Sequence, residues 1–404
     1  MNIVYIYAVN SCVDMNKHRL PIFLTTLATA LLAACNNSST PAGRSGANDQ
    51  AAPVVSEKVS FLIDTIQTDL DNPWGITWLP DGRMLVTERS GQILIFNDDQ
   101  YSNDNVVGFP QSYQRGQGGL LDIKAHPHAN QNGWIYATYA KPSAGGGSTA
   151  LVRFQLSGNT IEKLEELYQT HPIHSARIQF GSRIIFDNDG YVYFSTGDRG
   201  VMESAQDLTN DQGKVLRLYD DGRIPTDNPF VNTPGAMPAI WSYGHRNIQG
   251  MAYDPEQDMI YATEHGPRGG DELNIIEKGR NYGWPVITYG IAYDGAIISD
   301  LTEKEGMEQP IHYWVPSIAT CGLLFYTDSL YAGWERNLFA GGLAGMHIAR
   351  IEVAGDRYRR GEKLLQDIGR VRQVAQSPDG YIYVLTEGPG MLLKLMPMPN
   401  QATQ

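Results

Sequence analysis

Residues 242–285 carry side chains and a backbone turn that could bind a metal ion. In chain order these are Arg246 and Asn247, then Gly266 and Pro267, then Asp271 and Glu272. The turn can present bare carbonyl oxygens, and calcium coordination mixes such carbonyls with carboxylates. The segment therefore predicts a Ca²⁺ site. The alternative interpretation is an acidic loop that faces water.

Familiar catalytic and nucleotide-binding motifs are missing from the sequence. It contains no HExxH pair, phosphate-binding loop, nucleophile elbow or CxxC pair. The formal net charge is −13, from 31 Lys and Arg against 44 Asp and Glu, and no run of basic residues stands out. Because binding to phosphate backbones needs clustered positive charge, nucleic acid is excluded as a partner.

The elements that must position these residues follow a repeated pattern of a turn with Gly, an alternating strand, then Thr and a second turn. The repeats are 79–96, 188–200 and 377–395, with looser copies at 126–140, 254–266 and 334–353. Spread over residues 58–397, six units average about 57 residues, as a four-stranded blade with long loops requires. The pattern predicts an all-β fold, a six-bladed β-propeller, with a tail at 398–404.

Residues 158–170 show a different spacing. Ile161, Leu164, Leu167 and Tyr168 recur at intervals typical of a helix. We nevertheless expect a strand and a blade-edge loop here, because the flanking repeats are all β.

Longer motifs give the chain a family resemblance. They are GHRNIQG (244–250), EHGPRGGDELNII (264–276), NYGWP (281–285), GQGG (116–119), FGSR (180–183) and GRVRQ (369–373). With the segments between them, the sequence resembles the soluble aldose sugar dehydrogenases that use pyrroloquinoline quinone (PQQ), the glucose and sorbosone dehydrogenase family. The resemblance runs in order through residues 60–395, and it too implies a six-bladed propeller.

The resemblance implies which residues contact PQQ. Arg246 and Asn247 would face the quinone and the substrate. Arg370 and Arg372 would bind the cofactor carboxylates, a role suited to planar and permanently charged guanidinium groups. Two further positions that match cofactor contacts are Gln117 and Tyr293.

Two calcium ions are also implied. The backbone carbonyls of Gly266 and Pro267 would hold a Ca²⁺ that touches PQQ. Asp271, Glu272 and Tyr282 fall where the family binds a further, structural Ca²⁺. The reaction implied is oxidation of the anomeric hydroxyl of an aldose to a lactone, with hydride transfer to PQQ, and the electron acceptor stays unidentified.

Two positions depart from the family pattern. Gln179 stands where the family has its catalytic base His, and a neutral amide does not accept a proton near pH 7. Ala344 stands where some members carry a cofactor-binding Lys. His174 and His245 are candidate substitute bases, of which we favour His174.

Three function classes therefore remain open at this stage. They are an active PQQ-dependent sugar dehydrogenase, a catalytically weakened propeller that binds PQQ, Ca²⁺ or carbohydrate, and a hydrolase or lyase of another propeller family. The first is favoured, because the arginine pairs have no evident use in the third.

The first 35 residues resemble an export signal. Lys17 and Arg19 precede an apolar stretch, and the tetrad Leu32, Ala33, Ala34 and Cys35 resembles the lipobox of bacterial lipoproteins. We expect acylation at Cys35, a flexible tether at 36–57, and a periplasmic protein held to a membrane, more plausibly the outer one, only through its lipid. Met15 begins a better signal than Met1 does, so translation from Met15 would omit Cys12. The remaining Cys321 is then expected to be a small buried residue without a disulfide.

Overall fold

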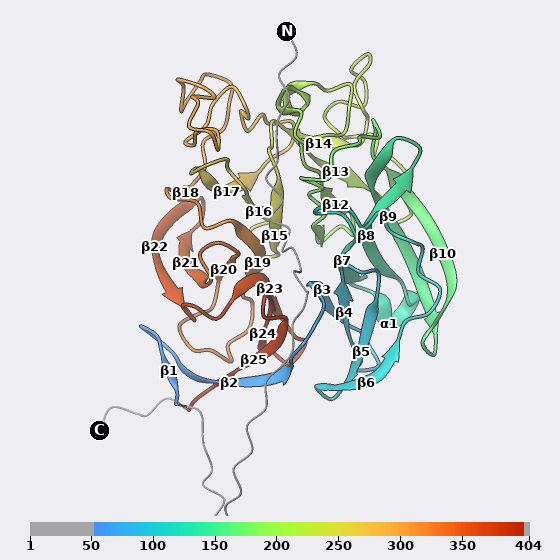
Figure 1. Cartoon of the computed structure of the whole chain (residues 1–404), viewed down its shortest axis with the longest axis vertical. Helices are drawn as coiled ribbons and strands as arrows, with labels where there is room; N and C mark the ends of the chain where they lie inside the picture. Colours follow the sequence, from blue (N-terminus) through green and yellow to red (C-terminus); the bar gives the residue numbers. More distant parts are fainter. Residues whose placement is uncertain (1–51, 400–404) are drawn as a thin grey trace, which may run out of the picture. The chain divides into compact units, whose positions relative to one another are not determined.

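Six antiparallel sheets form the part of the chain described by the computed structural model, residues 52–399 (Figure 1). Blade 1 is β3 (Pro73–Trp78), β4 (Met84–Glu88), β5 (Ile93–Asn97) and β6 (Gln100–Asn105). Blade 2 is β7 (Leu120–Ala125), β8 (Ile135–Ser143), β9 (Gly146–Ser157) and β10 (Thr160–Gln169). Blade 3 is β11 (Ile184–Phe186), β12 (Val192–Ser195), β13 (Lys214–Leu218) and β14 (Ile240–Tyr243).

The second half of the ring repeats this order. Blade 4 is β15 (Ile248–Asp254), β16 (Met259–Glu264), β17 (Asp271–Ile276) and β18 (His312–Trp314). Blade 5 is β19 (Thr320–Phe325), β20 (Asn337–Gly342), β21 (Ile348–Ala354) and β22 (Arg357–Leu364). Blade 6 is β23 (Arg370–Gln376), β24 (Ile382–Glu387), β25 (Met391–Pro397), β2 (Ser60–Gln67) and β1 (Val54–Val55). The six-bladed propeller expected from the repeats is confirmed.

Blade 6 closes the ring by joining the two ends of the described chain. The N-terminal β2 pairs antiparallel with the C-terminal β25, with Ile63 opposite Leu395. Figure 1 shows this pairing as blue against red. The first strands of successive blades, β3, β7, β11, β15, β19 and β23, contact one another all the way round. They therefore surround a central channel.

Apolar side chains fill the space between neighbouring blades. The described residues form one large cluster at each of the six junctions, such as Leu85 and Ile95 of blade 1 against Ile123 and Val152 of blade 2. Burying a large aliphatic side chain contributes about 1.5–3 kcal/mol. The junctions therefore hold the inner strands, and the side chains that they carry, in fixed positions.

The turns of the repeats lie between the first and second strands of each blade. In the closest copies, Gly82, Gly190 and Gly380 have φ of 89°, 83° and 85°, a conformation that favours glycine. Within 158–170, β10 covers Thr160–Gln169, so the strand expectation is confirmed. Register shifts after Ile161 and Glu166 mark bulges in β10, and a bulge inserts an extra residue that breaks strict alternation. This explains the helix-like spacing.

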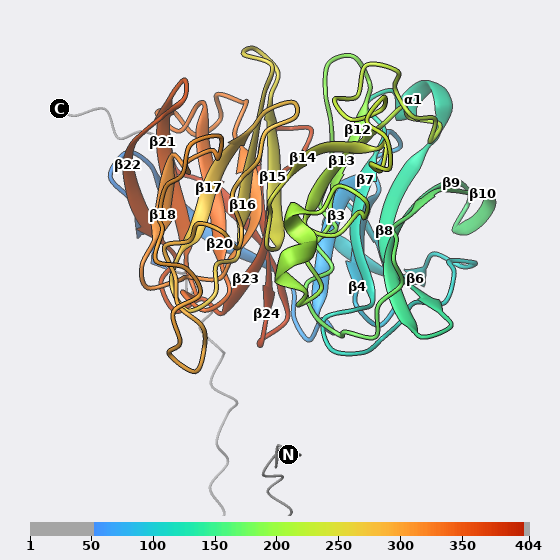
Figure 2. The ribbon, with the colours of Figure 1, turned by 90° about the horizontal axis from the view of Figure 1, so that it is seen from above.

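Helical structure within residues 52–399 is limited to α1 (Ala129–Asn132) and the 3₁₀ turn η1 (Met202–Gln206). Neither is long and apolar enough to cross a membrane. The long connection between β17 and β18, gold in Figure 2, projects beyond the strands. The described strands begin at Val54, inside the segment expected to be a tether. Cys35, the signal segment 1–35 and most of the tail lie outside the described residues.

Candidate active site

A cavity of about 160 Å³ lies in the channel where the first strands begin and the second strands end. We call it the arginine cavity. Its polar lining consists of Arg89, Gln117, Asn247, Gln249, His265, Arg370, Arg372 and Glu387. Four of the six residues expected to contact PQQ are thus brought together, from the loops before blades 2 and 4 and from blade 6.

Arg372 is held more firmly than any other cation of this cavity. Its Nε and Nη2 lie 2.8 and 2.6 Å from Glu387 Oε1. Its Nη1 lies 3.0 Å from Gln249 Oε1 and 3.0 Å from Cys321 Sγ. With its side chain only 8 % exposed, the guanidinium has one fixed orientation.

The other two arginines have fewer partners. Arg370 has a side chain that is 47 % exposed, with Nε 3.6 Å from Glu387 Oε2 and a 3.3 Å hydrogen bond to the Leu343 carbonyl. Arg89 Nε is buried and has no hydrogen-bond partner among residues 52–399. Three guanidinium groups therefore face one carboxylate, and a buried donor without a partner indicates a missing acceptor. The lining suits an anion with several oxygen atoms.

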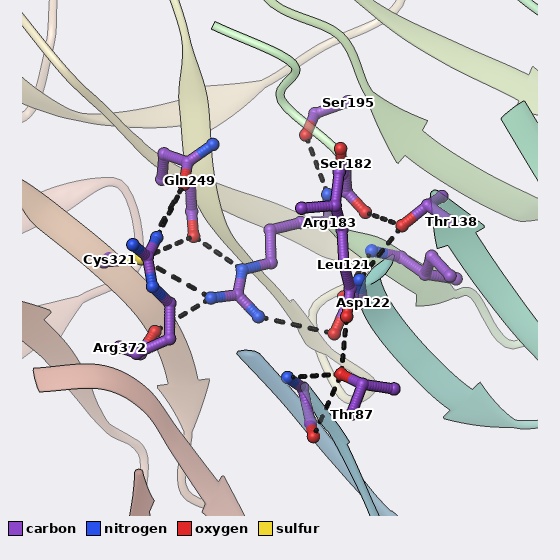
Figure 3. Close-up of polar contacts among 12 residues, drawn as sticks. Thr87, Leu121, Asp122, Thr138, Ser182, Arg183, Ser195, Gln249, Cys321 and Arg372 are labelled. Atoms are coloured by element: carbon purple, nitrogen blue, oxygen red, sulfur yellow. Dashed lines mark hydrogen bonds and ion pairs between the residues drawn. The ribbon is translucent and has the colours of Figure 1, made fainter. Parts of the chain in front are cut away.

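A second layer of polar residues fixes the base of this cavity (Figure 3). Arg183 donates from Nε to the Gln249 carbonyl at 2.6 Å and from Nη2 to the Arg372 carbonyl at 2.9 Å. Its guanidinium stacks 3.9 Å from the Trp74 ring and pairs with Asp122 at 3.3 Å. This layer therefore fixes the backbone of Arg372, whose side chain binds Glu387.

Cys321 lies in the same layer and is fully buried, which confirms the expectation of a small buried residue. Its sulfur accepts hydrogen bonds from Arg372 Nη1 at 3.0 Å and Arg183 Nη2 at 3.5 Å. Cys321 is the free cysteine of the described chain.

Gln179 lies beside the arginine cavity rather than in its lining. Its backbone N–H donates to Gln117 Oε1 at 2.7 Å, and its φ of 56° falls in the left-handed region. Its side-chain Oε1 is buried without a hydrogen-bond partner among residues 52–399. The amide is thus fixed next to a cavity-lining residue and has an acceptor free for a hydroxyl group.

Neither candidate substitute base lines the arginine cavity. The carbonyl of His174 accepts a 3.2 Å hydrogen bond from Gly147 N, so its loop packs on blade 2. His245 is fully buried, with Nε2 2.8 Å from Ser242 Oγ and Nδ1 3.2 Å from Glu264 Oε1. Both nitrogens of His245 already have partners.

Arg246 contributes to a neighbouring, much smaller cavity of about 10 Å³, which we call the carboxylate cavity. Its lining includes Glu264, His265, Gly266, Glu272 and Tyr282. Arg246 Nη1 donates to the His265 carbonyl at 3.0 Å, and Arg246 N donates to Glu264 Oε2 at 2.8 Å. The volume is about that of one water molecule or ion.

The three side chains expected to bind a structural calcium ion, Asp271, Glu272 and Tyr282, differ in their hydrogen bonds and in the effect of burial. Asp271 uses both carboxylate oxygens to accept backbone hydrogen bonds, from Gly266 N at 2.9 Å and Thr320 N at 3.2 Å. The Tyr282 hydroxyl accepts from Glu277 N at 2.8 Å and donates to a backbone carbonyl. Burial, together with the charge of Glu264, raises the pKa of Glu272 to about 8.

Within residues 52–399, no three His, Cys, Asp or Glu side chains are grouped to hold a metal. The carboxylates of Glu264 and Glu272 in the carboxylate cavity are chemically suited to a cation. Asp271 instead holds the Gly266 turn through a backbone hydrogen bond. Calcium here would depend on backbone carbonyls in addition to these two side chains.

His265 separates the two cavities, since it lines both. Its Nε2 donates to the Thr320 carbonyl at 2.8 Å, and burial lowers its pKa to about 4. The ring is therefore neutral at pH 7. Tyr293, by contrast, is 73 % exposed and lines neither cavity.

Sequence reasoning missed Arg89, Gln249, His265 and Glu387. Arg89 and His265 occupy equivalent places, directly after β4 and β16, which end at Glu88 and Glu264, and Glu387 is the corresponding last residue of β24. The signal was the Thr-Glu pair that closes the strand in repeats 79–96, 254–266 and 377–395.

The fold is a six-bladed propeller whose channel holds a cavity lined by three arginines. The chain belongs to the Glucose / Sorbosone dehydrogenase family, whose sequence profile matches residues 70–394. It is 39% identical over 343 residues to aldose sugar dehydrogenase YliI of Escherichia coli (strain K12), covering 83% of this chain and 92% of that protein. It is 29% identical to quinoprotein glucose dehydrogenase B of Acinetobacter calcoaceticus, covering 94% and 95%.

Solved structures agree with this assignment. The apo form of the soluble aldose sugar dehydrogenase from Escherichia coli superposes with a TM-score of 0.81 at 38% identity, covering 84% of this chain and 100% of that one. The PQQ-bound aldose sugar dehydrogenase of Streptomyces coelicolor gives 0.68 at 27% identity, covering 86% and 100%.

Proposed function

We propose that this protein oxidises an aldose at its anomeric carbon to a lactone, with PQQ as the hydride acceptor. The observation that carries the proposal is the arginine cavity, in which three guanidinium groups face a single carboxylate. PQQ is a planar tricarboxylate, so its oxygens would supply the acceptors that Arg89 and Arg372 can bind. A family relative with PQQ bound supports the same cofactor.

PQQ, when bound, supplies a quinone that takes up a hydride. The protein's part is to hold and orient the reactants. Arg372 is locked by Glu387 and so presents its charge in one direction. Arg246 and Asn247 follow one another at the border of the two cavities, where they could bind oxygen atoms of a sugar. Fixed donors of this kind stabilise negative charge as it develops on oxygen.

The proposal includes Ca²⁺ in the carboxylate cavity. Glu264 and Glu272 would provide its charged ligands and the turn at Gly266 and Pro267 its carbonyl oxygens. The raised pKa of Glu272 supports this, because a cation would offset the cost of burying its charge beside Glu264.

A second candidate is a weakened propeller that binds the cofactor or a sugar without efficient turnover. Gln179 is the observation that favours it, since its amide is in the family's base position and cannot accept a proton. Its buried Oε1 could still accept a hydrogen bond from the anomeric hydroxyl. Gln179 would then orient the substrate, and the proton would leave to water, which makes turnover slow at neutral pH.

The test is a dye-linked activity assay on the purified chain with added PQQ and Ca²⁺, against a panel of aldoses. Turnover of any aldose that depends on PQQ supports the dehydrogenase. Tight PQQ binding without turnover supports the weakened propeller. Absence of PQQ binding would contradict the dehydrogenase, and a chain that binds neither PQQ nor a sugar would contradict both.

We also propose that the protein is exported and anchored through an acylated Cys35. The support is the sequence of residues 15–35 alone, with its basic start, apolar stretch and lipobox.

A further inference from the structure

A second cavity, of about 280 Å³, occupies the opposite half of the propeller channel. The same inner strands line both halves. On β23, Arg370 and Arg372 face the arginine cavity and residues 373–376 face the second one. On β7, Leu121 lines the first and Lys124 the second. We call the second space the lysine cavity.

Arg183 forms the boundary between the two cavities. Its side chain lines the lysine cavity, while its Nη2 reaches the Arg372 carbonyl at 2.9 Å and its guanidinium covers the Trp74 ring. Figure 3 shows it between Arg372 on one side and Asp122 on the other. All three guanidinium nitrogens have partners, so Arg183 is held in one position between the two cavities.

Lys124 gives the lining of the lysine cavity one positive charge in excess. The other charged groups there are Arg183 and Asp122, which neutralise each other at 3.3 Å. No carboxylate or carbonyl among residues 52–399 forms a hydrogen bond or ion pair with the Lys124 amine. Lys124 is exposed to the water of the channel, and desolvation by the surrounding inner strands lowers the pKa of its amine although the charge of Asp122 opposes this shift. An anion would restore its charge balance.

Neutral polar groups line the same space. Gln373 Oε1 is buried with no hydrogen-bond partner among the described residues. It fits there because Gly322 has no side chain to fill that space. Gln376 Oε1 already accepts from Thr327 N at 3.0 Å and Thr327 Oγ1 at 3.2 Å, which leaves the Gln376 amide N–H groups as donors. The cavity thus combines a cation, spare donors and one spare acceptor.

We propose that the lysine cavity binds a small hydroxycarboxylate. The carboxylate pairs with Lys124, and a hydroxyl group donates to Gln373 Oε1. One uncompensated positive charge suits a monoanion rather than a polyanion. A neutral polyol would leave Lys124 without a partner, and a simple carboxylate would leave Gln373 without one, so each binds more weakly.

Calorimetric titration of the purified full-length chain with gluconate, acetate and sorbitol tests this site. Gluconate is expected to bind most tightly. Lys124→Met should weaken gluconate binding by about tenfold or more, because a charge-assisted hydrogen bond is lost. Lys124→Gln should do the same, which guards against one variant failing to fold. Lys304→Met, on an exposed loop, is the matched control and should bind as the wild type does.

Two further variants test which cavity binds gluconate and which group of the ligand contacts Gln373. Gln373→Met should weaken gluconate binding and leave acetate binding unchanged. Arg370→Met, in the arginine cavity, should leave gluconate binding unchanged. Equal affinities for acetate and gluconate, binding that survives both Lys124 variants, or loss of binding in Arg370→Met would each overturn the proposal. None of these outcomes depends on PQQ.

Discussion

Arg372→Met is expected to damage both the fold and the binding of PQQ. Arg372 forms two contacts of 2.8 and 2.6 Å with Glu387, whose side chain is only 9 % exposed. Removing one partner of a buried ion pair costs about 3–5 kcal/mol, and the lower end applies because Arg370 stays 3.6 Å from Glu387. The loss of one charge-assisted hydrogen bond to a PQQ carboxylate adds about 1.5–3 kcal/mol to the binding free energy. That is a fall in affinity of about 10- to 150-fold.

Arg370→Met is the matched control, because Arg370 is half exposed and weakly held. It should change unfolding free energy by less than about 1 kcal/mol, as expected for an exposed pair. The assays are urea unfolding and PQQ titration followed by tryptophan fluorescence, since Trp74 lines the cavity. Arg372→Lys keeps the charge but loses the two-nitrogen contact with Glu387. Its stability and PQQ affinity should lie between those of Arg372→Met and Arg370→Met. Equal PQQ affinity in wild type and Arg372→Met would refute the reasoning.

Three further predictions follow from the site and the sequence. Gln179→His should raise aldose turnover at pH 7 by about tenfold or more, because a positioned base is worth about 10²–10⁴ in rate. Fast wild-type turnover that this variant does not improve would contradict the view that Gln179 weakens catalysis. Removing Ca²⁺ with a chelator should lower the melting temperature, since a ligand at a hundredfold excess over its Kd adds about 2.7 kcal/mol to the free energy of unfolding. Glu272→Gln should abolish this response. A melting curve that does not change with chelator would contradict the calcium site. Cys35→Ser should move the protein from the membrane fraction to the soluble fraction, and an unchanged fraction would exclude the lipid anchor.

The propeller could be predicted from the sequence because its blades repeat locally. A turn glycine such as Gly82 needs only its neighbours to adopt a positive φ, and the alternation after it follows from burial of one strand face. Residues 158–170 could be misread as a helix because bulges in β10 depend on pairing with β9. That pairing is a property of the sheet and not of the segment.

The site could be predicted only in part, for a similar reason. The motif around Arg370 and Arg372 marks both as cofactor ligands, but only the pairing of β23 with β24, with its bulge at Arg372, decides that Glu387 locks Arg372 and leaves Arg370 loose. Arg183 and Arg372 are 189 residues apart in sequence, so no local pattern could reveal their contact. Arg89 could have been predicted from the sequence, because it follows the same Thr-Glu pair that precedes His265.

The most direct test of the central claim is an anaerobic absorbance titration of the purified chain, first with PQQ and then with an aldose. The account predicts saturable PQQ binding that is weakened in Arg372→Met, followed by reduction of the bound quinone when the sugar is added. Reduction that is slow at pH 7 and faster in Gln179→His would agree with the missing base. A chain that takes up no PQQ, or whose PQQ binding is indifferent to Arg372, would contradict the account.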